Sequence, residues 1–280
     1  GCQVLRHWSL VGGISAQMTA VEVMTANQEK ETYVLRQLDE AVLSRESKLL
    51  RFLEKTAVNV PKVHLQRDDL LVMEYVAGKA LYYAQDVQAV CVEMAKELCK
   101  IHQVQVPDNL KKAIPKLYER MDQIMDSRPQ RLDETFAEEK IRQVLEDAWP
   151  FMDKDASFLL HGDFWPGNLL WRDASLVAVT DWEDVELGTP LMDLAISQLD
   201  IFWVHGKKAM ETFTQMYQGL NVLDYSPLPY WQLYAALRPR LQFTLWSSAY
   251  PALGREDITE AAMRQKHGLF VKRALDQVAS

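Results

Sequence analysis

The stretch from His161 to Glu183, HGDFWPGNLLWRDASLVAVTDWE, decides which fold the rest of the sequence is expected to adopt. Two short apolar runs separated by a polar turn follow Asn168 and predict a β-hairpin. Asp163 and Asn168 lie in the loop before this hairpin, and Asp181 lies directly after it. A Pro-Gly pair between Asp163 and Asn168 predicts a turn that folds the amide back toward the carboxylate.

These polar side chains match the needs of phosphoryl transfer, which requires a carboxylate near the acceptor hydroxyl and oxygen ligands for magnesium. Asp163 is the candidate base, while Asn168 offers a neutral carbonyl oxygen and Asp181 a charged one. Lone Asp and Asn residues in loops are usually turn formers. The order HxDxxxxN, followed by an Asp after one hairpin, favours the catalytic interpretation. We interpret His161 and Asp193 as structural braces of the loop.

The segments HGDFWPGN and TDWEDVELGTPLMDLA resemble the catalytic loop and the metal-binding segment of the aminoglycoside phosphotransferase and choline kinase-like family, a relative of the protein kinases. The resemblance implies Asp163 as the catalytic base, Asn168 and Asp181 as Mg2+ ligands, and ATP as the co-substrate. It also implies an α+β, bilobal protein kinase-like fold. Residues 1–77 are expected to form a small N-lobe with an antiparallel sheet, and residues 78–280 a larger, mainly helical C-lobe with the acceptor site.

Nucleotide-binding residues are expected in the N-lobe. A small-residue loop with Gly13 and Ser15 lies between two apolar runs, and such a loop can place backbone N–H groups against phosphates. It lacks the full glycine pattern of protein kinases, and paired glycines are also common in plain hairpins. The apolar run that ends near Glu74 and Val76 resembles the family's interlobe hinge, which implies that adenine bonds their backbone.

Arg36 departs from the kinase pattern, because the family scheme usually places a phosphate-binding lysine at the end of this strand. An arginine can contact phosphate through its planar fork, although a strand-end surface arginine is the alternative. An amphipathic helix is predicted over Ser44–Lys55, with Glu46 beside its apolar face. A charge there needs a partner. We expect an ion pair with Arg36, as in the kinase N-lobe, and the alternative is a solvated glutamate.

Two further expectations concern helices. Asp86 is predicted to cap a helix whose apolar stripe ends at His102, and this histidine is interpreted as a hydrogen-bonded packing residue. The sequence Arg238-Pro239-Arg240 is predicted to kink a later helix.

Composition narrows the class of protein. A chain of 280 residues with 48% hydrophobic residues can bury a substantial core. The formal net charge of −8 argues against a nucleic-acid partner. The sequence shows no apolar run of roughly 18 residues and no signal peptide, so we expect no membrane partner. Three cysteines cannot make a disulfide framework, which favours the cytoplasm. A monomer or weak homodimer is expected.

The acceptor is expected to be a small hydroxylated molecule. From Asp173 to Gly206 the chain has no Lys or Arg but several Asp and Glu residues. This favours a cationic acceptor such as an amino sugar or amino alcohol, although a solvated acidic surface explains the pattern equally well. Trp165 suggests a ketoamine (fructosamine-type) kinase as an alternative, and Arg36 is the one hint of a non-catalytic pseudokinase.

Overall fold

The computed structural model describes residues 2–10, 17–126 and 129–279. Chain contacts group them into two compact units, each described here by itself. The first comprises the chain up to Ala80 with Pro107–Ile114 and Gly167–Glu183, and the second comprises Leu81–Val106, Pro115–Pro166 and Asp184 onward. The lobe boundary after residue 77 stays a prediction, and the hairpin after Gly167 belongs to the first unit by its contacts.

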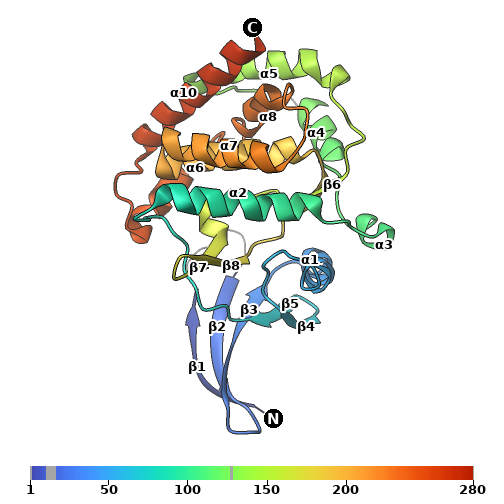
Figure 1. Ribbon diagram of the computed structural model, residues 1–280, viewed down its shortest axis with the longest axis vertical. Coiled ribbons are helices and arrows are strands. Elements are labelled where there is room, and N and C mark those ends of the chain that lie inside the picture. The colour runs from blue at the N-terminus through green and yellow to red at the C-terminus, as the bar shows by residue number, and fades with distance from the viewer. Residues whose placement is uncertain (1, 11–16, 127–128, 280) are drawn as a thin grey trace. The chain divides into compact units, whose positions relative to one another are not determined.

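The first unit is built on a five-stranded antiparallel sheet with the strand order β1-β2-β3-β5-β4. Strand β3, rich in branched and aromatic residues, lies at its centre (Figure 1). The polar turn between β2 and β3 is closed by the amide of Thr25, which donates to the Glu29 carbonyl at 2.8 Å. The strands are β1 (Gln3–Ser9), β2 (Gln17–Met24), β3 (Lys30–Gln37), β4 (Val63–Arg67) and β5 (Leu70–Glu74).

Helix α1 (Glu40–Leu53) packs against β4 and β5. It begins four residues before the predicted start at Ser44, because the Asp39 side chain accepts from the first-turn amides and caps the helix there. Its leucines form the buried face that periodicity predicted. The first unit also contains the short helix α3 (Asp108–Lys111) and the predicted hairpin, formed by β7 (Leu169–Arg172) and β8 (Ser175–Val179).

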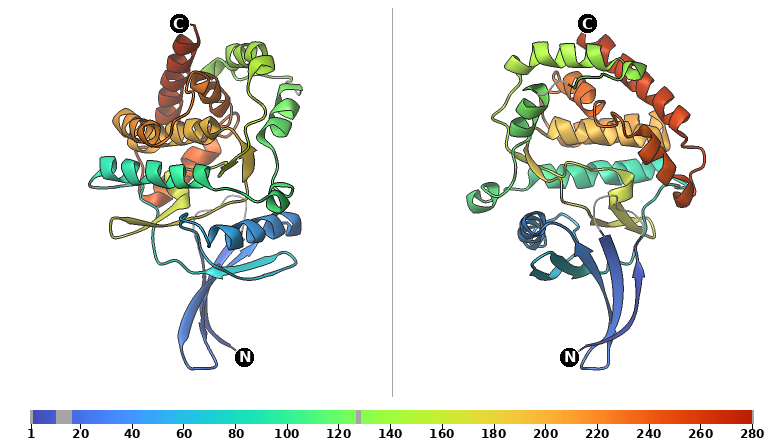
Figure 2. Two further views of the ribbon diagram at one scale, coloured as in Figure 1. Left: turned by 45° about the vertical axis from the view of Figure 1, so that its right-hand side comes forward. Right: turned by 180° about the vertical axis from the view of Figure 1, so that it is seen from behind.

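The second unit is mainly helical. Helix α6 (Pro190–His205) is apolar on nearly all sides and buried along almost its whole length, which places it at the centre of the unit. It packs between α7 and α8, while α2 packs on α7 and α10 contacts α6, α8 and α9 (Figures 1 and 2). The other helices are α2 (Val87–Gln103), α4 (Leu117–Asp126), α5 (Glu138–Ala148), α7 (Lys207–Leu220), α8 (Leu228–Ala235), α9 (Phe243–Ala249) and α10 (Glu260–Val278), with 3-10 turns at Glu134–Phe136, Trp149–Phe151 and Pro251–Leu253.

The helix predictions for this unit hold in part. The Asp86 side chain caps α2 as predicted, by accepting from the Ala89 amide at 2.9 Å. The segment around Arg238 separates helix α8 from helix α9, so the predicted kink within one helix is not found there.

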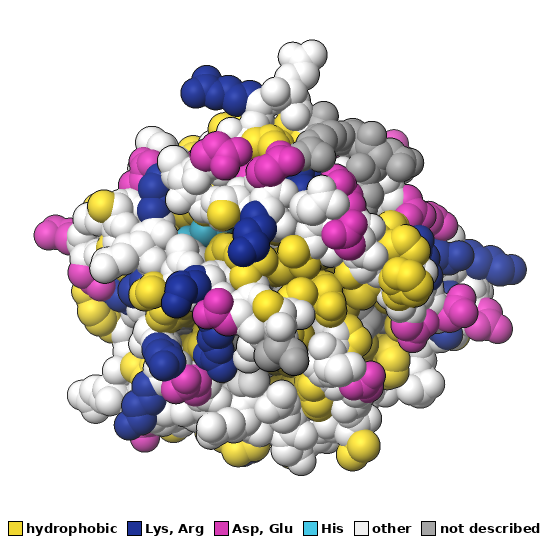
Figure 3. Space-filling model, turned by 90° about the horizontal axis from the view of Figure 1, so that it is seen from above, with side chains coloured by type: hydrophobic (Ala, Val, Ile, Leu, Met, Phe, Trp, Pro, Cys, Tyr) yellow, Lys and Arg dark blue, Asp and Glu magenta, His cyan; other side chains and the backbone are white. Residues whose placement is uncertain are grey.

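In the described part of the chain, no helix has both the length and the apolarity needed to cross a membrane. Figure 3 shows one face of the protein, on which acidic and basic side chains surround apolar patches.

A small sheet in the second unit, formed by β6 (Phe158–Leu160) and β9 (Glu186–Gly188), leads into the loop that carries Asp163. Gly162 in this loop has a φ of 83°. A Cβ atom there would lie 2.1 Å from the Asp184 carbonyl oxygen, which is closer than any side chain can approach. The loop therefore requires glycine both for its conformation and for its packing.

Gly162→Ala is expected to destabilise the protein by about 2–4 kcal/mol, since it adds backbone strain to a steric overlap. Gly268→Ala is the matched control, because Gly268 lies within α10 with open space around it. This control should stabilise by about 0.5–1 kcal/mol. Denaturant unfolding of both variants measures the difference. Equal stability of the two would show that the loop rearranges freely.

Candidate active site

The loop that carries Asp163 is fixed through its main chain. After β6 ends, the amides of His161 and Gly162 both donate to the Asp193 carboxylate on α6, at 2.7 and 2.9 Å. The amide of Asp163 donates to Nδ1 of His161 at 3.2 Å. These bonds hold the loop in one conformation and leave the side chain of Asp163 24% exposed.

Asp193 is wholly buried and has a second set of partners. Nε2 of His102 lies 3.1 Å from its carboxylate, and Nδ1 of His102 lies 2.6 Å from the Tyr217 hydroxyl. Burial alone would raise the pKa of Asp193, but the bonds from His102 and from the loop backbone outweigh it and hold that pKa below its ordinary value. The sequence-based interpretation of Asp193 and His102 as hydrogen-bonded structural residues is therefore confirmed.

The Asp163 carboxylate takes part in an ion pair that the sequence analysis missed. Nη2 of Arg238 bonds Oδ1 of Asp163, and Nη1 of Arg238 lies 3.4 Å from Oδ2 of Asp200 on α6. Burial alone would lower the pKa of the Arg238 guanidinium, but these two carboxylates raise it above its ordinary value. Burial raises the pKa of Asp200 to about 7 despite the nearby arginine.

A weak signal for this ion pair was present in the sequence. Arg238 interrupts an apolar run, LYAALRPRL, and a charge in such a run needs a partner. The partner is 75 residues away along the chain, so the local pattern could not identify it. Only the packing of the α8–α9 turn near the β6 loop brings the two together.

Asn168 and Asp181, the predicted magnesium ligands, lie at the same end of the β7–β8 hairpin. Leu169 pairs with Val179, and the amide of Thr180 donates to the Asn168 carbonyl at 2.9 Å, so Asp181 follows directly. Asp181 has a φ of 65°. That left-handed conformation costs a residue other than glycine about 1 kcal/mol or more, and such strain is common at functional positions.

Arg36 is 2% exposed and binds several carboxylates at once. Its Nη1 lies 3.4 Å from Glu46 on α1, and its Nη2 lies 2.7 Å from Asp181 and also bonds Glu183. The predicted ion pair between Arg36 and Glu46 is confirmed, and the interpretation of Arg36 as a surface residue is wrong. Glu183 is a partner that the sequence analysis did not single out.

Three carboxylates contact the Arg36 guanidinium. The Arg45 guanidinium lies beside them, and its Nη2 donates to the Glu183 carbonyl at 2.9 Å. Burial raises the pKa of Glu46 to about 7, and repulsion from Asp181 and Glu183 adds to the effect, while the Arg36 charge opposes it. A bound cation would relieve this repulsion. The amide oxygen of Asn168 and the carboxylate of Asp181 are donors that Mg2+ accepts.

Magnesium usually binds one or two protein carboxylates together with substrate phosphates. Among the described residues, no group of three or more His, Cys, Asp or Glu side chains is arranged to hold a metal.

The remaining predicted nucleotide-binding residues are only partly described. Gly13 and Ser15 lie outside the described residues. Glu74 is the last residue of β5, and its amide donates to the Lys62 carbonyl at 2.8 Å. Val76 follows two residues later, beyond the strand and partly buried. Arg36, Glu46 and Asp181 are thus brought together in the first unit, whereas Asp163 belongs to the second.

The acidic stretch after Asp173 is largely neutralised by bases from elsewhere in the chain. Glu186 binds the Arg120 guanidinium through two bonds of 2.6 and 2.7 Å. Asp193 and Asp200 have the partners described above, and the carboxylates of Asp181 and Glu183 bind Arg36. Most carboxylates of this run therefore have a partner within the protein, and those of Asp181 and Glu183 share Arg36 with Glu46.

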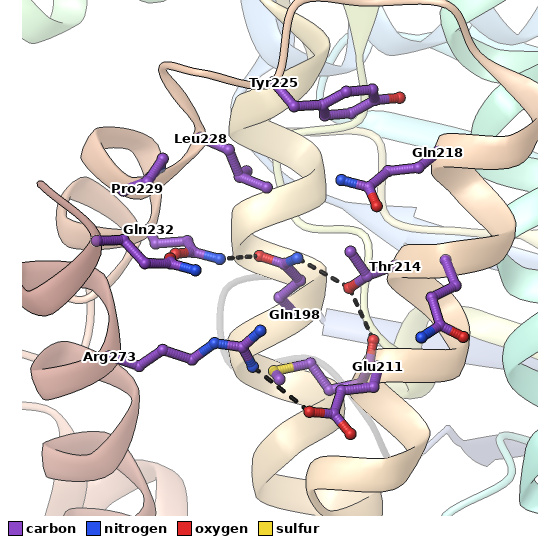
Figure 4. A pocket seen from close by; sticks show the side chains of 12 residues that line it. Gln198, Glu211, Thr214, Gln218, Tyr225, Leu228, Pro229, Gln232 and Arg273 are labelled. Atoms are coloured by element: carbon purple, nitrogen blue, oxygen red, sulfur yellow. Dashed lines mark hydrogen bonds and ion pairs between the residues drawn. The ribbon is translucent and has the colours of Figure 1, made fainter. Parts of the chain in front are cut away.

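A polar cavity of about 340 Å³ lies elsewhere in the second unit, between α6, α7, α8 and α10 (Figure 4). Gln198 bonds Thr214 at 2.8 Å and accepts from Gln232 at 2.7 Å. Gln198 and Asp200 are two positions apart on α6, so they project to nearly opposite sides of the helix. The cavity is therefore separate from the Asp163 loop, and its amides are bonded to one another.

Solved structures share this fold. An inferred aminoglycoside phosphotransferase of Ralstonia eutropha JMP134 matches with a TM-score of 0.67 at 17% identity, over 98% of this chain and 93% of that one. The amicoumacin kinase hAmiN, solved with AMP-PNP, Ca2+ and Ami, matches with a TM-score of 0.63 at 17% identity, over 95% and 88%. The macrolide 2'-phosphotransferase MphH of Brachybacterium faecium matches with a TM-score of 0.62 at 16% identity, over 92% and 91%.

At such low identities, the structural similarity shows the fold alone. It confirms the predicted α+β protein kinase-like class. Acyl-CoA dehydrogenase family member 11 of Pongo abelii is 32% identical over 99 residues, a match that spans 28% of this chain and 12% of that protein. The sequence model of the phosphotransferase enzyme family matches residues 11–237. This match covers most of the chain, including the Asp163 loop, the hairpin and the Arg36 strand, and the chain therefore belongs to the phosphotransferase enzyme family.

Proposed function

We propose that the protein transfers the γ-phosphoryl group of ATP to a hydroxyl group of a small molecule, with Asp163 as the catalytic base. A bond forms between the acceptor oxygen and the γ-phosphorus while the bond from that phosphorus to the ADP oxygen breaks. The hydroxyl proton passes to the Asp163 carboxylate. The support for this role is the position of Asp163 in a loop fixed by Asp193, together with the family match.

Asn168 and Asp181 are proposed to hold Mg2+, which when bound neutralises charge on the nucleotide phosphates. The observation that carries this proposal is the carboxylate cluster at the hairpin, where Asp181 shares the Arg36 guanidinium with two other carboxylates. The fork of Arg36 is proposed to contact phosphate as the usual lysine does. The loop with Gly13 and Ser15 is proposed to bind phosphate, and the backbone of Glu74 and Val76 to bind adenine.

The alternatives have unequal support. The hypothesis of a non-catalytic pseudokinase rested on Arg36, which stands where the family usually has a lysine. Arg36 nevertheless forms an ion pair between strand and helix of the kind that a kinase needs. The hypothesis of an amine-bearing acceptor rested on the acidic stretch, most of whose carboxylates have partners within the protein. The family match supports a small-molecule hydroxyl acceptor, and the ketoamine alternative rests on Trp165 alone.

The base is tested by Asp163→Asn, which keeps the shape of the side chain but removes its basicity. Turnover, measured as ADP release, should fall by about 10²–10⁴, the usual contribution of a positioned base. Stabilisation by magnesium and ATP in thermal unfolding should be retained. Asp276→Asn is the control, because Asp276 is 68% exposed on α10. Turnover of Asp163→Asn within about threefold of the wild type would remove Asp163 from this role.

The metal site is tested by comparing Asp181→Asn with Asp173→Asn. Both aspartates belong to the same hairpin segment and have positive φ, a conformation that Asn also tolerates, so the two substitutions are matched. Asp181→Asn should abolish the magnesium-dependent part of the rise in melting temperature on adding ATP, because it removes the charged ligand. Asp173→Asn should leave that rise unchanged. Asn168→Ala should reduce it less than Asp181→Asn does, since a dipole binds the cation less strongly than a charge. If ATP stabilises the wild type equally with magnesium and with chelator, the proposed site is wrong.

The Arg36–Glu46 pair is tested by a double-mutant cycle. Each single alanine substitution should weaken ATP binding, and the double substitution should weaken it much less than the sum of the two. Arg36→Lys should rescue only in part, because a point charge replaces a fork that binds several carboxylates. The exposed pair of Arg6 and Glu22 on the same sheet is the control cycle, where no effect is expected. Additive losses at Arg36 and Glu46 would show that the two residues act independently.

A further inference from the structure

Arg238 is the cation next to the proposed base. Its guanidinium bonds Oδ1 of Asp163 and approaches Asp200, and its side chain is 23% exposed, so part of it is accessible. An acceptor whose hydroxyl is within reach of Asp163 therefore also meets the guanidinium. This residue comes from the α8–α9 turn, and the reaction proposed above gives it no role.

The two carboxylate contacts of Arg238 differ in strength. Its weaker contact is to Asp200, at 3.4 Å, whose carboxyl is buried in α6. Burial raises the pKa of Asp200 to about 7, and the Arg238 charge opposes that rise. Nη2 bonds Asp163, Nη1 makes only the long contact to Asp200, and Asp184 acts on the guanidinium from farther away. A guanidinium has five N–H donors in a planar fork, so this arrangement leaves donors for another oxyanion.

One aromatic ring lies beside Arg238, and an aromatic pair includes a residue of the Asp163 loop. The ring centre of Trp246 lies 5.9 Å from the Arg238 guanidinium carbon. Tyr82 and Trp165, which lies two residues after Asp163, pack with ring centres 6.0 Å apart. Stacking and neighbouring rings fix the plane of a guanidinium, which favours planar recognition of a carboxylate or phosphate.

We propose, on the basis of the phosphotransferase function above, that the acceptor is an anionic hydroxy compound and that Arg238 binds its carboxylate or phosphate group while Asp163 receives the hydroxyl proton. An amine close to the reacting hydroxyl would instead approach a guanidinium of the same sign. Arg238 is thus a specificity-determining residue, and the class of acceptor follows from the charge beside the base rather than from the acidic stretch of the sequence.

The test measures binding of matched compounds by thermal unfolding at constant ionic strength, with saturating magnesium and a non-hydrolysable ATP analogue to fill the nucleotide site. Gluconate, sorbitol and glucamine share a polyol chain and differ in charge. Glycerate, glycerol and glycerol 3-phosphate separate a carboxylate from a phosphate source. We expect the best anionic member to bind the wild type at least about tenfold more tightly than its neutral and cationic counterparts.

Arg238→Gln should reduce this preference to less than about threefold, and Arg238→Lys should restore part of it. Arg240→Gln is the matched control, because Arg240 lies in the same turn with the same 23% exposure but binds Glu138. Arg240→Gln should keep the preference for the anionic compound. The inference is overturned if no anion binds the wild type, if a neutral or cationic member binds as tightly, or if the preference survives Arg238→Gln.

The same samples separate this inference from the function on which it rests. If magnesium and the ATP analogue fail to stabilise the wild type, the proposed phosphotransfer fails, whatever the anions do. If they stabilise it and the anion preference is absent, the inference about the acceptor alone is wrong. ADP release with ATP and the same compounds should follow the binding order, and faster release with sorbitol or glucamine than with gluconate also overturns it.

Discussion

The buried carboxylate of Asp193 is the interaction on which the second unit depends. It accepts the amides of His161 and Gly162 and is held in turn by His102, so one side chain joins the β6 loop to helices α2 and α6. A buried carboxylate without such partners would be strongly unfavourable. Because its hydrogen bonds hold the pKa of Asp193 low, the group stays charged and continues to order the loop. The conformation at Gly162 follows from this attachment, and so does the position of Asp163.

Two arginines organise the charges on which the proposed chemistry depends, and each contacts more than one carboxylate. Arg36 binds Glu46, Asp181 and Glu183 in the first unit. Arg238 contacts Asp163 and Asp200 in the second. A guanidinium suits this role because its donors form a rigid, planar fork, whereas a lysine offers a single point of charge.

In both clusters a buried carboxyl has its pKa raised to about 7, at Glu46 and at Asp200. Burial is the main cause of each shift, and the nearby arginine opposes it. A metal or a substrate that changes the local charge would shift these protonation states, since a group's pKa depends on its neighbours. This links ligand binding at each cluster to pH through residues of the protein itself.

The sequence by itself determined most of the elements and the candidate reacting groups, because those depend on local order. The spacing of Asp163, Asn168 and Asp181 around one hairpin, and the amphipathic pattern that placed Glu46 beside a buried face, are properties of short segments. The start of α1 was misplaced because a cap at Asp39 outweighs the apolar pattern that marks the helix. Tertiary structure alone decided how the charges balance. The acidic stretch suggested a cationic acceptor, but its carboxylates pair with Arg36, Arg120 and Arg238, which come from distant segments. The physical reason is that the charge a ligand meets depends on distances in space, and these are set by how helices and strands far apart in the chain pack together.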